Sequence, residues 1–503
     1  MTYKQVSEWP DVYTFKLVPD ELLDQCLDLI DEGHDVATIV QGTGIDYRSL
    51  LHALSCRYFD EGNPELARNL IEHEARKSRD FRLVIQWIRT IFACPEDDEH
   101  LLLEATRLLA DSFSTSDATP HLKIRRKPRS HGNIRIGFLC SWSFSRLFRF
   151  SIVPLVNRVD RTRFSVGLFC LKNERSPEVS GSIKRKFDFV ERIEAGDEKL
   201  AYDKIASHDL DILFDLNGHL CVDNPTIALL QKPAKVMVNW MNSPVSSGLA
   251  AYDYYLTDPF TVPKENQYLY SEKVKYLDCN CAATFELPNR SVPHSPVSEG
   301  YNFVFNSFNE VFKLNPLTLK VWSEILRRAP DSVLILKGNS LNADHSRKRK
   351  HIWRYMVDEG GVDPSRVIIT PPRPFEEMLD DYGTADLSLG PIRYNGLTTT
   401  INSIWMGVPV IGYIGNKAED RGAGAVMNQV GLQEFMAYSI EEYIEKAVAF
   451  ALNPARLIEL RLKLRERLTK YAYYNPDLFS ESFMRACDDM LNSYHNIDTG
   501  GTA

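Results

Sequence analysis

The stretch "LGPIRYNGLTTTINSIWMGVPVIG", from Leu389 to Gly412, has the layout of a ligand site in an α/β protein. An apolar strand is predicted to end near Ile392, the loop "RYNG" follows, a helix begins at about Thr398, and a buried apolar strand follows Gly407. In an open α/β sheet, ligands bind beyond the carboxyl ends of the strands, where a glycine-containing loop feeds a helix. The sequence therefore predicts an anion site at this loop.

The residues at the helix start suit a phosphate. The first turn of a helix has unpaired N–H groups and about half a positive charge. Thr398 and Thr399, preceded by Gly396 in the loop, can therefore offer backbone and hydroxyl donors to a phosphate. Asn402 lies on the same helix face and is placed to reach a ribose hydroxyl. In the alternative interpretation, Thr398 only caps its helix.

Length and composition limit the possible domain organisation and function of the chain. A chain of 503 residues is too long for one core, so two or three domains are expected. With 68 acidic and 59 basic side chains, the net charge of −9 argues against a nucleic-acid footprint or a general binder of anionic membranes. The sequence has no run of eighteen apolar residues, and its beginning lacks the pattern of a signal peptide, so we expect no membrane span and a cytoplasmic location.

The cysteines give no metal site. Nine are scattered along the chain, and only Cys279 and Cys281 lie close together. An odd, dispersed set is what a reducing compartment tolerates. The Cys-Asn-Cys pair lacks two further ligands at a suitable spacing, so we expect no bound metal.

The first 125 residues are predicted to form a helical domain. Apolar residues recur at three and four positions in several segments, among them "DELLDQCLDLIDEG" and "RLVIQWIRTIFA". Leu54, Tyr58, Gly62 and Ala67 have the spacing of one tetratricopeptide-like helix pair. Such repeats need several copies to build a groove, which favours a helical cap on the next domain over a peptide-binding array.

Two α/β domains are predicted to follow. Polar, proline-containing linkers at 114–132 and 286–300 separate regions in which short apolar strands alternate with helices. We therefore predict Rossmann-like domains over 133–290 and 300–495, the second including the C-terminal helices. Two doubly wound halves that face a cleft are typical of the GT-B fold, and less specifically of hinged two-domain α/β enzymes.

Each predicted α/β domain offers polar residues at a strand end. In "FNSFNEVFKLNP", Asn309, Glu310 and Lys313 precede a helix, and a lysine there can neutralise a diphosphate, although most loop lysines are only solvated. In "DILFDLNGH", Asp215 and His219 follow a strand of the first domain. His219 has a suitable pKa for acid–base work, but a lone histidine at a strand end is more often structural.

These residues resemble a known family. "FNEVFKLNPLTLKVWSEILRRAPDSVLIL" and "YNGLTTTINSIWMGVPVI" are similar to the catalytic region of the protein O-GlcNAc transferases, glycosyltransferase family 41. "KPAKVMVNWMNSPVSSGLAAYDYYLTD" in the first α/β domain resembles that family too, and the likeness covers roughly residues 133–452. It implies a metal-independent GT-B transferase that uses no cofactor, binds a nucleotide-sugar in the C-terminal domain and presents a protein hydroxyl from the N-terminal side.

The resemblance carries roles onto particular residues. Lys313 matches the family's diphosphate-binding lysine, and Thr398 with Thr399 match its phosphate-binding helix start. The chain departs from the pattern at Leu397, where the family usually has histidine, and at Asn402, where it has aspartate.

Further departures lie at the active-site mouth and in the base-binding loop. Arg146 stands at about the position of a family histidine. In "PPRPFEEML", Arg373, Phe375 and Met378 replace a small residue, a lysine and a histidine, so a rebuilt base pocket is expected around Arg373 and Phe375.

Three functions follow from this pattern. The first is a cytoplasmic glycosyltransferase that acts on protein Ser/Thr hydroxyls, with UDP-GlcNAc or a similar sugar as the donor implied by the resemblance. The second keeps the fold but uses another donor, such as a CMP-linked nonulosonate, on flagellin or an adhesin. The third is a non-catalytic module that binds a nucleotide-sugar or a protein, which the missing histidines favour.

Overall fold

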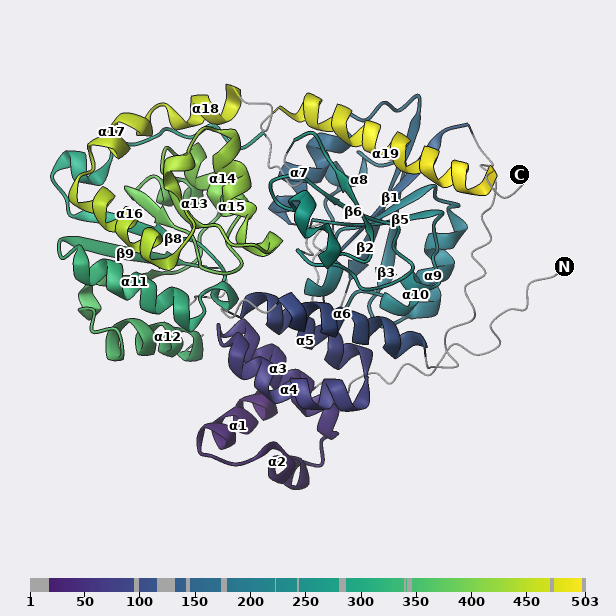
Figure 1. Cartoon of the computed structure of the whole chain (residues 1–503), viewed down its shortest axis with the longest axis horizontal. Coiled ribbons are helices and arrows are strands. Elements are labelled where there is room, and N and C mark those ends of the chain that lie inside the picture. The colour runs from purple at the N-terminus through teal and green to yellow at the C-terminus, as the bar shows by residue number, and fades with distance from the viewer. Residues whose placement is uncertain are drawn as a thin grey trace.

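A computed structural model gives the structure of the chain. It describes residues 18–94, 99–114, 132–141, 145–172, 179–221, 223–241, 244–279, 286–338, 341, 346–470 and 475–499. Figure 1 shows two lobes side by side, with a helical domain below them. The Cys281 position of the Cys-Asn-Cys pair lies outside the described residues.

The helical domain forms because apolar residues at helical spacing face one another across antiparallel neighbours. Its helices are α1 (Asp20–Asp31), α2 (Val36–Thr43), α3 (Tyr47–Asp60), α4 (Pro64–Ser78), α5 (Phe81–Ala93) and α6 (Glu99–Ser114). The predicted tetratricopeptide-like pair is the α3–α4 hairpin: Leu54 and Ala67 are fully buried, and Gly62 turns the chain with φ +88°. The short helix α2 was not expected from the sequence.

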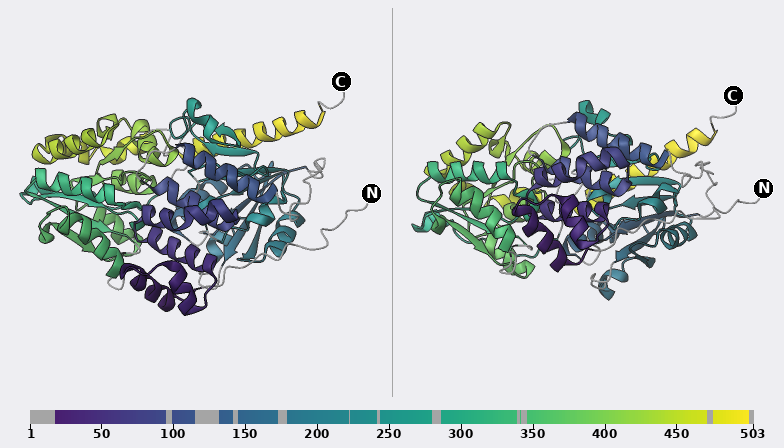
Figure 2. Two further views of the ribbon diagram at one scale, coloured as in Figure 1. Left: turned by 60° about the horizontal axis from the view of Figure 1, so that its bottom comes forward. Right: turned by 90° about the horizontal axis from the view of Figure 1, so that it is seen from below.

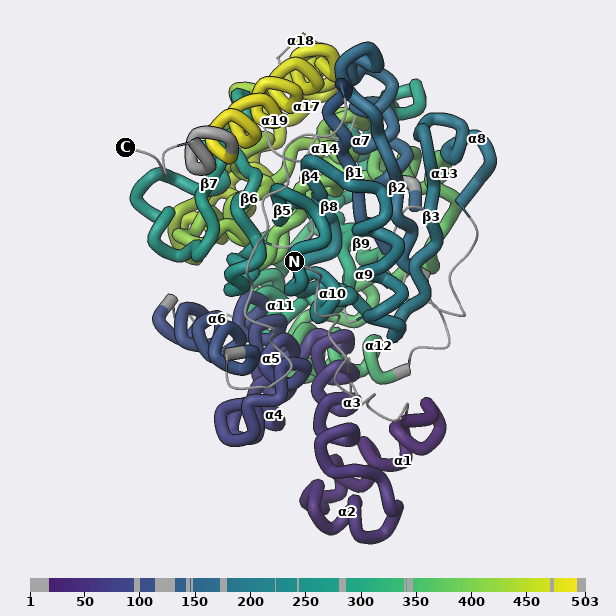
Figure 3. The backbone as a smooth tube through the Cα atoms, turned by 90° about the vertical axis from the view of Figure 1, so that its right-hand side faces the viewer, coloured from purple at the N-terminus to yellow at the C-terminus, as the bar shows by residue number. Residues whose placement is uncertain are grey.

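The first lobe is built on a parallel sheet of seven strands in the order β3-β2-β1-β4-β5-β6-β7, which Figure 3 shows from the side. Its strands are β1 (Ile134–Cys140), β2 (Phe164–Lys172), β3 (Phe189–Glu194), β4 (Ile212–Asp215), β5 (Val236–Trp240), β6 (Tyr254–Thr257) and β7 (Lys273–Tyr276). Five of these were predicted among the apolar strands. The edge strands β3 and β7 were not, because each is only partly buried and lacks a continuous apolar run.

The two faces of this sheet have different cores. Its helices are α7 (Arg146–Val156), α8 (Gly181–Lys184), α9 (Glu198–Ser207) and α10 (Thr226–Leu230). Phe138 of β1 lies in one apolar cluster with residues of α7, whereas its neighbour Leu139 lies in another cluster with Trp87 and Ile88 of α5. The helical domain therefore covers one face of the first sheet, as a cap does.

The second lobe has a parallel sheet of six strands in the order β10-β9-β8-β11-β12-β13. Its strands are β8 (Phe303–Ser307), β9 (Ser332–Lys337), β10 (Val367–Thr370), β11 (Leu387–Leu389), β12 (Val410–Tyr413) and β13 (Met436–Ala437). Its helices are α11 (Pro316–Arg328), α12 (Ser346–Trp353), α13 (Phe375–Tyr382), α14 (Thr398–Trp405), α15 (Gly422–Gln429), α16 (Ile440–Leu452), α17 (Ala455–Arg461) and α18 (Leu464–Lys470). The two sheets and their helices give the expected pair of Rossmann-like domains.

The last helix returns to the first lobe. Helix α19 (Pro476–Thr499) runs across the first domain in Figure 1, although the sequence grouped it with the second. Phe483 is fully buried and lies 5.0 Å from Phe214 and 5.5 Å from Trp240, between ring centroids. Apolar periodicity predicts a helix but does not say which lobe its apolar face covers. None of the described helices is long and apolar enough to cross a membrane.

Replacing Phe483 by alanine is expected to destabilise the first lobe by about 3–5 kcal/mol, because a fully buried aromatic side chain is removed from a packed cluster. Leu478→Ala on the same helix is the control, since Leu478 is 43% exposed. Thermal unfolding measures both. Equal shifts in the two variants would show that α19 does not pack on the first sheet in this way.

Candidate functional site

Two loops of the second lobe meet at the carboxyl ends of neighbouring strands. One follows β8 and carries Asn309 and Lys313, and the other follows β11 and leads to α14. Since β8 and β11 pair in parallel, both loops leave the sheet at the same edge. The Thr399 hydroxyl donates to Asn309 Oδ1 at 3.2 Å, and this bond joins the two loops directly.

A second set of bonds fixes the loop before α14. Asn315 caps α11, and its Nδ2 donates to the Ile392 carbonyl at 3.0 Å. The Thr318 hydroxyl also donates to that carbonyl at 3.0 Å. The first turn of α11 therefore fixes the loop between β11 and α14, where the sequence predicts an anion site.

Lys313 projects over an aromatic ring. It ends the 3₁₀ turn η4 (Val311–Lys313), and its Nζ lies 4.2 Å from the centroid of the Tyr394 ring and 5.8 Å from that of Phe312. Burial lowers the pKa of the Lys313 ammonium to about 8, and the nearby Glu310 carboxylate opposes the shift. An ammonium in these surroundings gains from the approach of an anion.

The start of α14 leaves its N–H groups available. Leu397 occupies the N-cap position and no side chain caps the helix, so Thr398 is a helical residue and not the cap. Gly396, two residues before Thr398, packs tightly against its neighbours. A Cβ at this position would clash with the Thr399 hydroxyl and lie 2.8 Å from Asn309 Oδ1. Only glycine lets this loop approach the β8 loop so closely.

Asn402 has an unsatisfied acceptor. It is 7% exposed, and its Oδ1 forms no hydrogen bond of good geometry, although the amide lies close enough to the buried Tyr382 hydroxyl to oppose the larger rise that burial causes in the pKa of that hydroxyl. A buried, unpaired oxygen costs about 1–3 kcal/mol, so it calls for an explanation. Its place one turn beyond Thr398 makes it a candidate acceptor for a ligand hydroxyl.

The residues expected in the base-binding loop separate in the structure. Phe375 begins α13 and stacks on Phe150 of α7 at 5.3 Å, across the two lobes. Arg373 instead forms ion pairs with Glu377 at 2.7 Å and Asp381 at 2.8 Å. Phe375 also lines a pocket at this loop.

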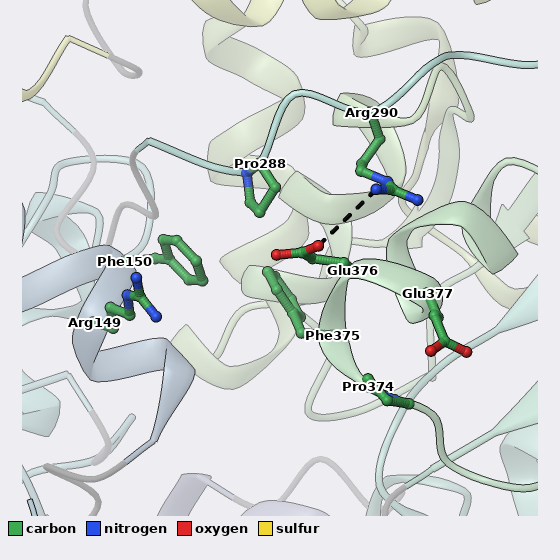
Figure 4. Close-up of a pocket in the computed structure, with 8 residues that line it drawn as sticks. All are labelled: Arg149, Phe150, Pro288, Arg290, Pro374, Phe375, Glu376 and Glu377. Atoms are coloured by element: carbon green, nitrogen blue, oxygen red, sulfur yellow. Dashed lines mark ion pairs between the residues drawn. The ribbon is translucent and has the colours of Figure 1, made fainter. Parts of the chain in front are cut away.

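That pocket has a volume of about 310 Å³ and lies between α7, the linker before β8 and α13 (Figure 4). Its lining residues are Arg149, Phe150, Pro288, Arg290, Pro374, Phe375, Glu376 and Glu377. The Arg290–Glu376 ion pair, at 4.0 Å, crosses from the linker to α13. Its two phenylalanine rings and its charged rim suit a planar, polar group.

On the side of the first lobe, His219 is buried in the 3₁₀ turn η1 (Gly218–Leu220). Its Nε2 lies 3.0 Å from the Ser247 carbonyl oxygen, which can only accept, so the ring proton is on Nε2. Burial lowers the pKa of His219, which keeps the ring neutral. In this position His219 fixes the loop that contains Ser247.

Asp215 is also occupied by structural contacts. Its Oδ1 accepts from the backbone N–H of Asn217 at 2.9 Å, and its Oδ2 accepts from Asn224 Nδ2 at 3.0 Å and from the Tyr252 hydroxyl at 2.6 Å. These three donors stabilise the buried Asp215 carboxylate in its position at the end of β4. Its geometry is that of an anchor for the loop after β4.

Arg146 begins α7, but its side chain lies outside the described part of the chain.

Tyr394 was not expected from the sequence, although it supplies the ring beneath Lys313. Its φ of +56° is unusual for a residue with a side chain and gives no signal in a single sequence. Such backbone strain is often found at functional sites.

Metal binding receives no support from a ligand cluster. Among the residues that the structure describes, no group of three or more histidine, cysteine, aspartate or glutamate side chains is placed to hold an ion. The cationic and N–H groups of the two loops are the features that could meet a negatively charged ligand.

The sequence and the fold are similar to those of known proteins. The family model of glycosyl transferase family 41 matches residues 104–286 and 297–483. A probable UDP-N-acetylglucosamine–peptide N-acetylglucosaminyltransferase, SPINDLY of Solanum lycopersicum, is 31% identical over 277 residues, or 54% of this chain. The probable enzyme of the same description called SEC, from Arabidopsis thaliana, is 34% identical over 278 residues, or 53% of the chain.

A solved structure shows the same fold. A mutant of the Thermobaculum terrenum O-GlcNAc transferase superposes with a TM-score of 0.80, at 22% identity, over 91% of this chain and 86% of that one. The curated relatives are longer proteins, of which the matched regions make up only 29% for the tomato protein and 28% for SEC.

Lys313→Ala is expected to weaken the binding of UDP by about ten- to hundredfold, the range of a charge-assisted hydrogen bond of about 1.5–3 kcal/mol. For the wild type, affinity should fall as the pH rises through about 8, because the free lysine then loses its charge. Calorimetry at a series of pH values measures both effects.

Lys320→Ala is the matched control, since Lys320 lies on α11 with its side chain 56% exposed. It should bind UDP like the wild type. Equal affinity of the Lys313 variant and the wild type would remove Lys313 from the site.

Proposed function

The chain belongs to glycosyl transferase family 41, and from that membership we propose that it transfers a sugar from a nucleotide-sugar to a hydroxyl of a protein serine or threonine. The names of its relatives describe UDP-N-acetylglucosamine as donor and peptide as acceptor, which makes UDP-GlcNAc or a similar sugar the first donor to test. The proposal includes a cytoplasmic location, which the odd, dispersed set of cysteines favours.

One observation carries the proposal. Asn309 and Thr399 are hydrogen-bonded to each other at the uncapped start of α14, next to Gly396, and Lys313 lies over the ring of Tyr394 in the loop before that helix. Asn402, one turn further along α14, has a buried Oδ1 that forms no hydrogen bond of good geometry. The ammonium and the helix N–H groups match a diphosphate, and the amide oxygen matches a ribose hydroxyl. A nucleoside diphosphate has these groups in the same order.

The chemistry follows from this arrangement. The acceptor oxygen forms a bond to the anomeric carbon of the sugar, and the bond from that carbon to the diphosphate oxygen breaks. The nucleoside diphosphate leaves with the bonding electron pair, and the proton of the acceptor hydroxyl passes to the leaving diphosphate or to water. Donors fixed in advance around the leaving oxygens stabilise the charge that develops on them. In this proposal Lys313 and the first N–H groups of α14 are those donors, and no cofactor is needed.

A second candidate is the same reaction with a different nucleotide. Leu397 and Asn402 depart from the family pattern, and Phe375 with its partner Phe150 lines a pocket between the lobes. An amide at position 402 accepts a hydrogen bond more weakly than a carboxylate does. These differences favour a donor other than a UDP-sugar, such as a CMP-linked nonulosonate.

A panel of nucleotides is expected to show selective binding, because a polar pocket rejects a mismatched base by leaving its own groups unpaired. At a hundred times its Kd, the preferred ligand should stabilise the fold by about 2.7 kcal/mol in a thermal-shift assay. If the second candidate is right, the double variant Leu397→His, Asn402→Asp should shift preference away from the native nucleotide and toward UDP.

Either of two patterns of results would support the binding-module function. If the wild type bound no nucleotide at millimolar concentration while the double variant bound UDP, the site would have lost its donor. Selective binding without sugar transfer to any peptide would support a nucleotide-sugar-binding module.

Turnover is expected to survive EDTA. The sequence has no Asp-x-Asp at the carboxyl end of a strand, and Lys313 and α14 already supply positive charge for the diphosphate. The release of nucleoside diphosphate measures the rate with and without the chelator. Loss of activity that manganese or magnesium restores would contradict the assigned roles.

A further inference from the structure

The helical domain touches the loop that carries Lys313. In Figure 2 the helical domain, coloured purple to blue, lies against the second lobe as well as the first. Phe59 of α3 stacks on Phe312 with ring centroids 5.2 Å apart and planes at 18°, and Phe92 of α5 meets Tyr394 edge to face at 5.4 Å. Both helical phenylalanines are 1% exposed.

The backbone at this contact fits closely. A Cβ at Gly62, the turn between α3 and α4, would lie 2.9 Å from the Val311 carbonyl oxygen and 3.0 Å from that of Leu314. These two residues flank Phe312 and Lys313 in the chain. The turn of the helical domain therefore leaves the lysine loop no room to move toward it.

The two rings that the helical domain contacts are the two rings beside the ammonium. Lys313 Nζ faces Tyr394 at 4.2 Å and Phe312 at 5.8 Å, and these rings lie 5.6 Å from each other. Phe59 supports one of them and Phe92 the other. The position of the ammonium thus depends on a stack of rings that begins in the helical domain.

We infer that Phe59 and Phe92 are positioning residues for Lys313, so that the helical domain forms part of the nucleotide-sugar site as well as covering the first sheet. This inference rests on the proposed role of Lys313 in diphosphate binding. It differs from the cap interpretation, in which every buried phenylalanine of the helical domain would have the same importance for the ligand.

The test compares three phenylalanine-to-leucine variants, which keep apolar volume and remove the ring. Phe59→Leu and Phe92→Leu change the stack. Phe113→Leu is the matched control, because Phe113 lies in the same domain, is 9% exposed and packs on Phe81 at 5.2 Å, away from the lysine loop. Calorimetry with UDP gives the affinity of the full-length variants, and thermal unfolding confirms that each is folded.

The two stack variants should bind UDP about two- to tenfold more weakly than the wild type, in the range for coupled neighbours, while Phe113→Leu should bind it unchanged. Made in the Lys313→Ala background, the stack variants should cause no further loss. Such a double-mutant cycle separates positioning of the lysine from general destabilisation.

Three results would overturn the inference: unchanged affinity in both folded stack variants, an equal loss in Phe113→Leu, or a loss that persists without Lys313. If a stack variant does not fold, Phe312→Leu tests the same stack from the side of the second lobe. If Lys313→Ala itself binds UDP normally, the proposed function fails and the inference fails with it. If only Lys313→Ala weakens binding, the inference alone is wrong.

Discussion

The site depends on the ammonium group of Lys313, whose charged form the nearby Glu310 carboxylate favours only in part against the effect of burial. Within the part of the chain that the structure describes, Lys313 forms no ion pair, and the face of the Tyr394 ring supports its charge instead. A cation over an aromatic ring is worth about 0.5–2 kcal/mol, less than a close carboxylate would supply in the same place. The charge thus remains available to an anion, and burial has already reduced its hydration.

The position of the Lys313 ammonium over the Tyr394 ring accounts for the backbone of the loop before α14. The Tyr394 ring must lie beneath the lysine, and the backbone at Arg393 and Tyr394 adopts positive φ angles of +62° and +56° to place it. A buried ion pair between Arg393 and Asp420 and the hydrogen bonds from α11 to Ile392 hold that strained segment. Strain of this kind persists only where the surrounding contacts over-determine it.

Local patterns predicted much of the architecture. Continuous apolar strands such as β1 and β8 and the glycine loop before α14 could be read directly from the sequence. The edge strand β3 was missed because half-exposed strands resemble loops, and α19 was assigned to the wrong lobe because periodicity does not identify a packing partner. Asp215 illustrates the limit for site residues: one of its donors, Tyr252, lies 37 residues away along the chain, so its structural contacts could not be foreseen.

The most direct measurement is a crystal structure of the protein with UDP bound. Phosphate oxygens are expected within about 3 Å of Lys313 Nζ and of the first N–H groups of α14, and a ribose hydroxyl within the same distance of Asn402 Oδ1. UDP bound elsewhere, or a diphosphate at α14 with Lys313 turned away from it, would contradict the central claim that the lysine over Tyr394 holds the donor.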